Sequence, residues 1–339
     1  MNMNEKVTDL IAQAHKVIII QAENADGDSI GSAVALEAIL EGLGKDVALY
    51  CPVQVPTYLR YIDGWDRISD EFDLSADLAI IVDTTSKVLL SKTLDQSAVS
   101  DWFGKHPVIA IDHHASVEPD LPFEVKYMIS DIAVATGEMV YDLARENDWL
   151  IDAAAASGLY ISIQADTLGL TTETVGARQF EICAELIKLG ANPAELEGRR
   201  RELSRKSQRI LHYKGELLDR IEYHADNRLA LVKVPFEEIA KYSNEYNPTM
   251  LVLDEMRLVV GVDVAIGTKT YPDGKFTAKI RSNVPVADQI AGFFGGGGHK
   301  YAAGFRIYEE DVEKAENELI GAVDRVLLEY DKGKTADVA

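Results

Sequence analysis

Short apolar runs alternate with amphipathic segments through the first 190 residues, and this alternation restricts the fold more than any other feature of the sequence. Strands are predicted at the apolar runs 17–20, 46–50, 76–85 and 107–114. Helices are predicted at 33–43, 136–146, 153–164 and 177–190. Runs rich in Val and Ile that alternate with helices are typical of a doubly wound, mainly parallel sheet. We therefore expect an α/β fold for this part of the chain.

The pattern changes after residue 198. Residues 198–214 carry seven Lys and Arg in a chain that is otherwise acidic, and we interpret this stretch as a linker helix. Further strands are predicted at 229–234, 258–270 and 276–283, and the YPDGK sequence predicts a hairpin turn at 271–275. Helices are predicted at 286–294 and 311–330. The expected domains are residues 1–195, a linker helix at 196–214, and a smaller α/β domain with a mixed or antiparallel sheet at 215–339.

Composition excludes several classes of protein. The net charge is −22 and the pI is near 4.7, so bulk electrostatics would repel long duplex nucleic acid. The two cysteines, Cys51 and Cys183, are far apart and lack the spacing of a zinc site. No apolar run approaches the length of a membrane span, and the N-terminus is too polar for a secretory signal. We expect a cytoplasmic protein that does not contact membranes.

Acidic side chains collect where the predicted strands end. Ligands bind at this edge of an open parallel sheet. The residues are Asp26 and Asp28 after the first strand, Asp83, the triplet Asp112-His113-His114, and Asp166 at the end of a predicted helix. Any one aspartate here is as readily a turn residue or helix cap. Together the carboxylates would repel one another unless a cation lay between them, and oxygen ligands with one or two imidazoles suit Mn²⁺ or Mg²⁺. A pair of such ions about 3.5–4 Å apart suits phosphoester hydrolysis.

Five motifs together resemble one known family. They are DGDSIGS at 26–32, IVDTTS at 81–86, IDHH at 111–114, QADT at 164–167 and GGGGHKYAAG at 295–304. Their order and spacing resemble the DHH phosphoesterases, in the branch with a C-terminal DHHA1 domain. The chain is most similar to the short oligoribonuclease and pAp-phosphatase type. The DHH triplet alone would be a weak signal, whereas the full set is highly specific and covers nearly the whole chain.

The resemblance implies two manganese ions between the domains, with Mg²⁺ as an alternative. Asp26 and Asp83 resemble the ligands of one ion. The resemblance assigns four ligands to the other ion: Asp28, Asp83, His113 and Asp166. Asp83 would thus be shared between the two ions. His114 resembles the histidine beside the scissile phosphate, and Asp112 resembles the aspartate that orients the imidazoles.

The second domain is expected to bind substrate. By resemblance, Arg281 holds a substrate phosphate through its bidentate guanidinium, and the glycine run with its histidine contacts the nucleotide, at Gly296, Gly297, Gly298 and His299. A cleft between the two domains would then hold the reaction. The basic linker could guide a short nucleic acid, but a solvated helix with i,i+4 pairs such as Glu202–Lys206 is the favoured interpretation.

One position departs from the family pattern. The family usually carries a metal-binding histidine four residues before the first aspartate and a proline just before it, and here Ala22 and Ala25 stand in those places. Alanine cannot bind a metal, so the first metal site is either weakened or rebuilt with Glu23 or Asn24.

Three functions remain open at the level of the sequence. The leading one is a metal-dependent phosphoesterase that hydrolyses short oligoribonucleotides, or small nucleotides such as pAp. The second is a phosphodiesterase for a cyclic or linear dinucleotide. The third is a nucleotide-binding protein whose catalysis is weakened by the loss of the histidine at position 22. The expected partners are thus short RNA or DNA oligonucleotides or small nucleotides, and the family resemblance is compatible with a homodimer.

Overall fold

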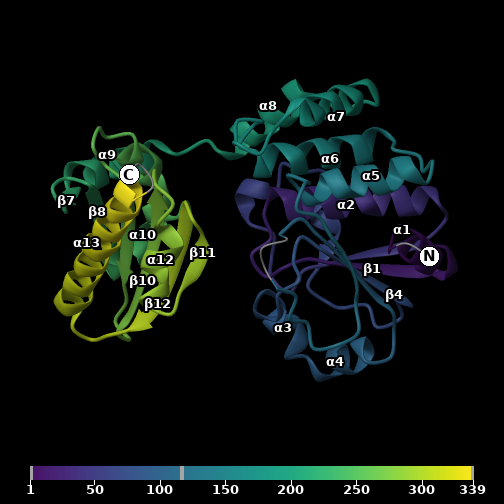
Figure 1. Ribbon diagram of the computed structural model, residues 1–339, viewed down its shortest axis with the longest axis horizontal. Coiled ribbons are helices and arrows are strands. Elements are labelled where there is room, and N and C mark those ends of the chain that lie inside the picture. Colours follow the sequence, from purple (N-terminus) through teal and green to yellow (C-terminus); the bar gives the residue numbers. More distant parts are fainter. Residues whose placement is uncertain (1–2, 115–117, 337–339) are drawn as a thin grey trace. The chain divides into compact units, whose positions relative to one another are not determined.

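The computed structural model describes residues 3–114 and 118–336, in two compact units, Met1–Arg205 and Lys206–Ala339 (Figure 1). The predicted single linker helix is wrong, because the segment forms two helices, α8 (Pro193–Leu203) and α9 (Gln208–Asp219). Helix α9 begins after Ser207, because the Ser207 Oγ accepts a hydrogen bond from the backbone N–H of Ile210 and caps the helix. We describe each unit on its own.

The first unit contains a six-stranded sheet in which every pair of neighbours is parallel, as predicted. Its order is β3-β2-β1-β4-β5-β6. The strands are β1 (Lys16–Ile20), β2 (Asp46–Tyr50), β3 (Ile68–Ser69), β4 (Leu78–Val82), β5 (Val108–Asp112) and β6 (Lys126–Ile129). The edge strands β3 and β6 were not predicted, because they are short and only partly buried.

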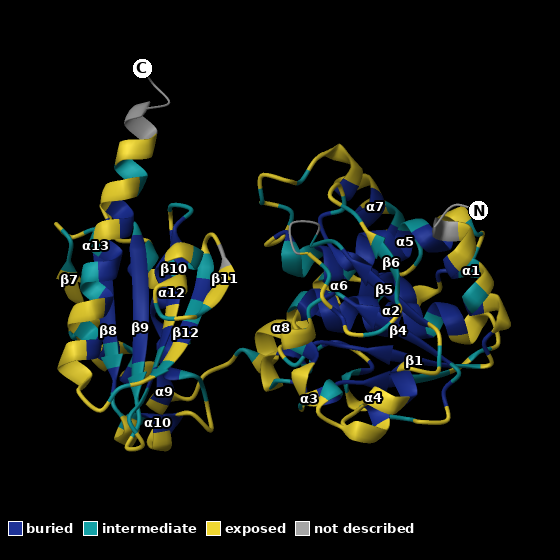
Figure 2. Cartoon of the chain, turned by 60° about the horizontal axis from the view of Figure 1, so that its bottom comes forward, coloured by how far each residue is buried: buried dark blue, intermediate teal, exposed yellow. Residues whose placement is uncertain are grey.

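Helices cover both faces of this sheet. They are α1 (Met3–Gln13), α2 (Gly27–Gly42), α3 (Ser91–Leu94), α4 (Ser97–Phe103), α5 (Thr136–Glu146), α6 (Ala153–Asp166) and α7 (Ala177–Lys188), with short 3-10 turns at Thr57–Leu59, Trp65–Arg67 and Lys87–Leu90. Figure 1 shows α2, α5 and α6 on one side and α3 and α4 on the other. Alternate residues of β1 enter the two cores, with Val17 and Ile19 facing the first group and Ile18 and Ile20 the second. Figure 2 shows the resulting buried central strands.

Helix α2 begins at Gly27, six residues before the predicted start at 33. The carboxylate of Asp26 accepts hydrogen bonds from the backbone N–H groups of Asp28 (3.0 Å) and Ser29 (3.1 Å), and so caps the helix. Asp28 therefore lies in the first helical turn rather than in a loop.

The second unit contains a mixed six-stranded sheet of order β11-β12-β10-β9-β8-β7. Only β8 and β9 pair in parallel. The strands are β7 (Glu222–His224), β8 (Leu229–Val234), β9 (Val264–Thr270), β10 (Lys275–Ser282), β11 (Gly297–His299) and β12 (Ala302–Tyr308). The strand predicted at 258–270 starts later than expected, at Val264, and the side chains of Leu258 and Val260 are exposed.

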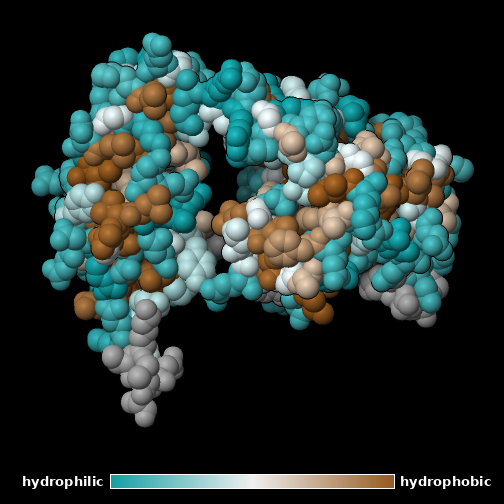
Figure 3. Space-filling model, turned by 90° about the horizontal axis from the view of Figure 1, so that it is seen from above, coloured by the Kyte–Doolittle hydropathy of each residue, from teal (hydrophilic) through white to brown (hydrophobic). Residues whose placement is uncertain are grey.

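Two separate cores lie on the two faces of this second sheet. The long helix α13 (Val312–Ala336) and α12 (Ala287–Gly292) pack on one face. On the other face lie α9, α10 (Phe236–Tyr242), the 3-10 turn Pro248–Leu251 and α11 (Leu253–Arg257). Among the described residues, no helix is both long enough and apolar enough to cross a membrane. Figure 3 shows hydrophobic side chains interspersed with hydrophilic ones over one face of the molecule.

Candidate active site

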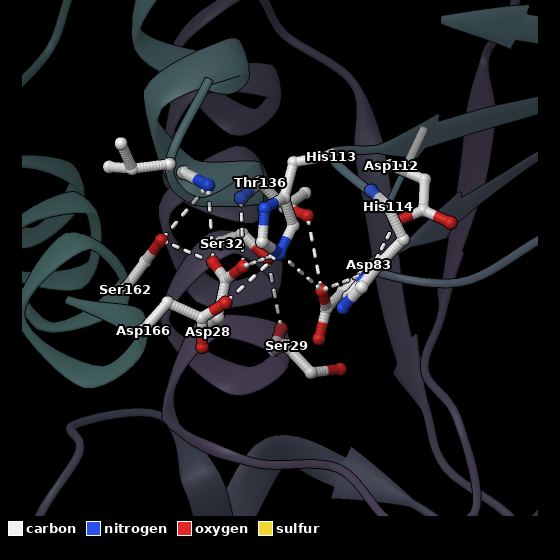
Figure 4. A network of polar contacts seen from close by, with 12 residues as sticks. Asp28, Ser29, Ser32, Asp83, Asp112, His113, His114, Thr136, Ser162 and Asp166 are labelled. Carbon is white, nitrogen blue, oxygen red and sulfur yellow. Dashed lines mark hydrogen bonds and ion pairs between the residues drawn. The ribbon is translucent and has the colours of Figure 1, made fainter. Parts of the chain in front are cut away.

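Asp28 joins three helices of the first unit. Its carboxylate is completely buried and accepts hydrogen bonds from the backbone N–H groups of Thr136 (2.7 Å) and Gly137 (3.2 Å) at the start of α5. It also accepts one from the hydroxyl of Ser162 on α6, at 2.5 Å. These donors fix the carboxylate beside the ends of the strands (Figure 4).

Asp83 follows β4 in an uncommon backbone conformation. Its φ of 63° lies in the left-handed region, which costs an aspartate energy and is usual only where surrounding contacts enforce it. The backbone N–H of Asp83 donates to the carbonyl of Ile111 (2.9 Å), and the Thr136 hydroxyl donates to its carboxylate (3.3 Å). The turn brings the Asp83 carboxylate next to both histidines of the triplet.

Asp112 orients His114. The Asp112 carboxylate is buried and accepts hydrogen bonds from the backbone N–H of His114 (3.0 Å) and from its Nδ1 (2.7 Å), while the Thr85 hydroxyl donates to its other oxygen (3.2 Å). Burial alone would raise the pKa of Asp112, but the bonds from His114 outweigh it and lower that pKa. Asp112 is therefore an anion that holds Nδ1 as the protonated nitrogen of the ring.

His113 turns its Nε2 atom toward three carboxylates. The distances from Nε2 are 2.9 Å to Asp166, 3.5 Å to Asp28 and 3.7 Å to Asp83. Yet this buried nitrogen makes no well-formed hydrogen bond with the described residues. Burial would lower the pKa of His113, but the carboxylates, Asp166 first among them, raise it. A ring nitrogen that faces three carboxylates at once is the arrangement expected where these groups share a metal ion.

The carboxylates themselves are destabilised as anions. Burial, followed by repulsion from Asp166, raises the pKa of Asp28 to about 6. Burial and then the neighbouring carboxylates, Asp28 first, raise the pKa of Asp83 well above its usual value. The pKa of Asp26 is raised as well, by desolvation and then by the charge of Asp166, although the residue as a whole is exposed. A divalent cation would relieve this repulsion, and the donor set of oxygens and imidazoles fits Mn²⁺ or Mg²⁺.

Two groups of side chains offer ligand atoms within 4.8 Å of one another. One group is Asp28, His113 and Asp166, and the other is Asp83, His113 and His114. Asp26 belongs to neither group, since its carboxylate caps α2. The structure therefore brings together four of the five residues predicted to bind metal. The fifth, Asp26, is near enough to Asp83 for its charge to help raise the pKa of that carboxyl.

The place of the missing histidine is occupied by small and uncharged groups. Ala22 is buried, and its carbonyl accepts a hydrogen bond from the thiol of Cys51 (3.4 Å). The Glu23 carboxylate is held elsewhere, by the hydroxyl of Ser91 (2.7 Å) and the backbone N–H of Lys92 (2.5 Å). Nothing among these contacts supplies a substitute ligand from Glu23.

Sequence reasoning missed the hydroxyls that hold the carboxylates. They are Thr85, Thr136 and Ser162. Ser162 lies in a largely apolar helix, and a lone hydroxyl on such a buried face was the available signal. Thr136 and Thr85 gave no distinctive signal, because threonine is common in turns and at helix starts.

The predicted substrate residues lie in the second unit. Arg281 is half-buried on β10, and burial lowers its pKa. Within the glycine run, Gly297 and Gly298 belong to β11 and pair with β12. At Gly296 an added Cβ would lie 2.3 Å from the carbonyl oxygen of Gly304, so glycine is required for this close approach. The side chain of His299 lies outside the described residues.

The basic linker is neutralised by local ion pairs. Arg199 pairs with Asp63 and Glu195, Arg200 and Arg201 with Glu197, Arg205 with Glu202, Arg209 with Glu245, and Lys214 with Glu255. This pattern favours the interpretation as solvated helices over a guide for nucleic acid.

Comparison with known proteins agrees with this geometry. Residues 16–163 match the model described as "DHH family, N-terminal domain". Residues 16–163 therefore form a domain of the DHH phosphoesterase family. Over 302 residues, covering 88% of this chain and 86% of the relative, the chain is 26% identical to the bifunctional oligoribonuclease and PAP phosphatase NrnA of Thermus thermophilus.

Two solved structures share its fold. An exopolyphosphatase-related protein from Bacteroides fragilis aligns with a TM-score of 0.81 at 21% identity, covering 97% of this chain and 96% of that one. RecJ from Thermus thermophilus in complex with Mn²⁺ aligns with a TM-score of 0.54 at 17% identity, covering 95% of this chain and 54% of that one. The α/β fold predicted from the sequence is therefore confirmed, and a relative of this fold binds manganese.

Proposed function

We propose that the protein is a Mn²⁺-dependent phosphoesterase that hydrolyses short oligoribonucleotides and small nucleotides such as pAp. The observation that carries this proposal is the convergence of Asp28, Asp83 and Asp166 on the Nε2 atom of His113. The similarity to an oligoribonuclease and PAP phosphatase over most of both chains supports the choice of substrate.

In this proposal one ion is held by Asp28, Asp83, His113 and Asp166. A second would be held by Asp26 and Asp83, and it would be bound more weakly because Ala22 brings no ligand. When bound, the ions would supply a hydroxide nucleophile and offset charge on the phosphoryl oxygens.

The protein's own groups then orient the reactants. Asp112 and its bond to Nδ1 hold the His114 ring in one orientation, so His114 can contact a phosphoryl oxygen from a fixed direction. The Thr136 and Ser162 hydroxyls, with two backbone N–H groups, fix the Asp28 and Asp83 carboxylates before the reaction begins. In the second unit, Arg281, Gly296, Gly297, Gly298 and His299 are proposed to bind the substrate.

A substrate panel tests the proposal. Purified protein with Mn²⁺ is incubated with pAp, a diribonucleotide, a five-residue RNA and cyclic di-AMP, and the products are separated by chromatography. We expect turnover of pAp and of the short RNAs, and none of it in EDTA. Turnover of cyclic di-AMP alone would favour the dinucleotide alternative, and tight binding without turnover of any compound would favour a binding protein.

A further inference from the structure

A cavity of about 760 Å³ lies between α6 and α8 of the first unit, and we call it the α6–α8 cavity. Its residues on α6 are Tyr160, Ile161, Gln164 and Ala165, and their spacing puts them on one side of that helix. Figures 1 and 2 both show α8 next to α6. Sites that bind small molecules usually have volumes of roughly 300–1,000 Å³, so the cavity is large enough for such a ligand.

Two tyrosine rings give the cavity flat apolar surface. Tyr61 and Tyr160 are both half-buried, and both pack against the core of the first unit, which limits their movement. Burial raises the pKa of each phenol, so both hydroxyls stay protonated at neutral pH and can donate hydrogen bonds. Gln164 adds an amide that can both donate and accept. Aromatic rings with polar groups beside them are the usual means by which proteins bind nucleobases.

Positive charge lines the α8 side of the cavity. Arg200 and Arg201 both face the cavity, and both donate hydrogen bonds to the single carboxylate of Glu197. Two guanidinium groups that share one carboxylate leave a net charge of +1. Arginine suits a phosphate group because its planar guanidinium can make two hydrogen bonds to it. The cavity thus combines a surface for a base with a charge for a phosphate.

A strained turn forms one edge of the cavity. Three successive residues, Leu168, Gly169 and Leu170, have left-handed φ angles of 49°, 78° and 65°. Leucine rarely adopts this backbone, because its Cβ crowds the following carbonyl oxygen. The hydroxyl of Thr167 accepts a hydrogen bond from the backbone N–H of Leu170 (2.9 Å) and stabilises the turn. Leu168 lines the cavity with a side chain that is 73% exposed, and a ligand packed against it would account for this arrangement.

The cavity adjoins the candidate active site but consists of other residues. Asp166, whose carboxylate lies 2.9 Å from the Nε2 atom of His113, stands in the chain between Ala165 of the cavity and the strained turn. Ala165 also packs closely against Gly27 at the start of α2. Of the described residues that were predicted to bind metal or substrate, none is among those that line the cavity.

We propose that the α6–α8 cavity is a nucleotide-binding site, in which a base packs against Tyr160 and Leu168 and a phosphate is bound by Arg200 and Arg201. The ligand is a nucleoside monophosphate, either free or as one residue of an RNA chain. The choice of a nucleotide rests on the proposed function, whereas the binding itself needs neither metal nor turnover.

The first test is calorimetric titration of the full chain with AMP in EDTA. Arg281→Ala is the background for every protein, so that the phosphate contact proposed for the second unit is removed. Tyr160→Leu keeps an apolar side chain but removes the ring, and it should bind AMP at least about fivefold more weakly, the lower end for one base stacked on an aromatic ring. Tyr160→Phe keeps the ring and is the matched control, and it should bind AMP nearly as the background protein does.

The second test concerns the phosphate. Arg200→Ala/Arg201→Ala should weaken the binding of AMP and leave the binding of adenosine unchanged. The control Arg205→Ala/Lys314→Ala removes the same number of charges from exposed ion pairs outside the cavity, with Glu202 and Glu309, and should change neither. Thermal unfolding confirms that each variant is folded.

Kinetics with Mn²⁺ distinguish the two sources of the nucleotide. If the cavity holds a residue of the RNA chain, Tyr160→Leu should raise KM for a diribonucleotide. If it holds a free nucleotide, that KM should stay the same while AMP still binds more weakly. No binding of AMP in the Arg281→Ala background, equal binding by the Leu and Phe variants at position 160, or equal weakening by the charge control would overturn the inference. Binding of AMP in the cavity without hydrolysis of any compound would instead contradict the proposed function.

Discussion

Asp83 carries two local costs at once, a left-handed backbone and a carboxylate crowded by other carboxylates. Both are explained if the carboxylate is a ligand shared between cations. The same reasoning applies to His113, whose buried Nε2 faces three carboxylates at 2.9 to 3.7 Å.

Replacing Asp83 by Asn should therefore separate stability from function. Asparagine tolerates the left-handed backbone and keeps the shape of the side chain, but it removes one of the crowded negative charges. We expect Asp83→Asn to unfold at a higher temperature than the wild type in EDTA. In Mn²⁺ its activity should fall by more than about 100-fold. A fall of about 100-fold is the most that is usual when the replaced residue only hydrogen-bonds a metal ligand. A variant that is destabilised in EDTA and retains activity would contradict both roles.

Position 22 gives a second prediction at the scale of single residues. Ala22→His restores a neutral imidazole at the end of β1, and it should lower the Mn²⁺ concentration needed for half-maximal activity. Glu23→Ala should leave that concentration nearly unchanged, because the Glu23 carboxylate is bound by Ser91 and Lys92. A titration of activity against Mn²⁺ for the three proteins distinguishes the cases. Strong loss in Glu23→Ala would show that the first site was rebuilt around Glu23.

At the scale of elements, the sequence predicted the central strands of the first sheet and helix α5 closely, because each has a clear apolar period. It placed the start of α2 too late, since the capping by Asp26 depends on a side-chain bond that composition does not reveal. It also missed β11, because a run of glycines has no strand pattern and is defined by its pairing with β12. The carboxylates expected to bind metal were proposed from their positions at or beside strand ends and from the family resemblance, whereas the supporting hydroxyls depend on tertiary contacts.

The contact between α2 and α6 positions Asp28 beside Asp166, and it depends on glycine. A Cβ added to Gly31 would lie 2.6 Å from the carbonyl oxygen of Gly158. We expect Gly31→Ala to lower the free energy of unfolding by about 1–3 kcal/mol, as overpacked sites do. Gly42, at the end of the same helix, has no atom within 4 Å of such a Cβ. Urea denaturation should show Gly42→Ala as neutral or slightly stabilising, and equal destabilisation by both changes would show that the helix contact is not the cause.

At the scale of the whole molecule, the acidic cluster links metal binding, folding and pH. The pKa of Asp28 is raised to about 6 in the folded chain, above its usual value near 3.9. Protonation of Asp28 therefore stabilises the folded, metal-free chain, and this contribution to the free energy of unfolding is fully present below about pH 3.9. It is lost as the pH rises through about 6.

Bound metal should consequently stabilise the chain more at high pH than at low pH. Protons compete with the cation for the same oxygens, so Mn²⁺ binds more tightly once they have left. We expect the rise in unfolding temperature caused by added Mn²⁺ to be larger at pH 8 than at pH 5.5. Differential scanning fluorimetry measures this directly, and Asp28→Asn should abolish most of the difference. A larger rise at pH 5.5 would contradict the assignment of Asp28 as a ligand.

The most direct test of the central claim is anomalous diffraction at the manganese edge from crystals of the chain grown with Mn²⁺. The account predicts a strong peak within coordinating distance of Asp28, Asp83, His113 and Asp166. A second and weaker peak is expected beside Asp26 and Asp83, and Ala22→His should strengthen it. Manganese bound only elsewhere, with His113 Nε2 in an ordinary hydrogen bond to Asp166, would contradict the account.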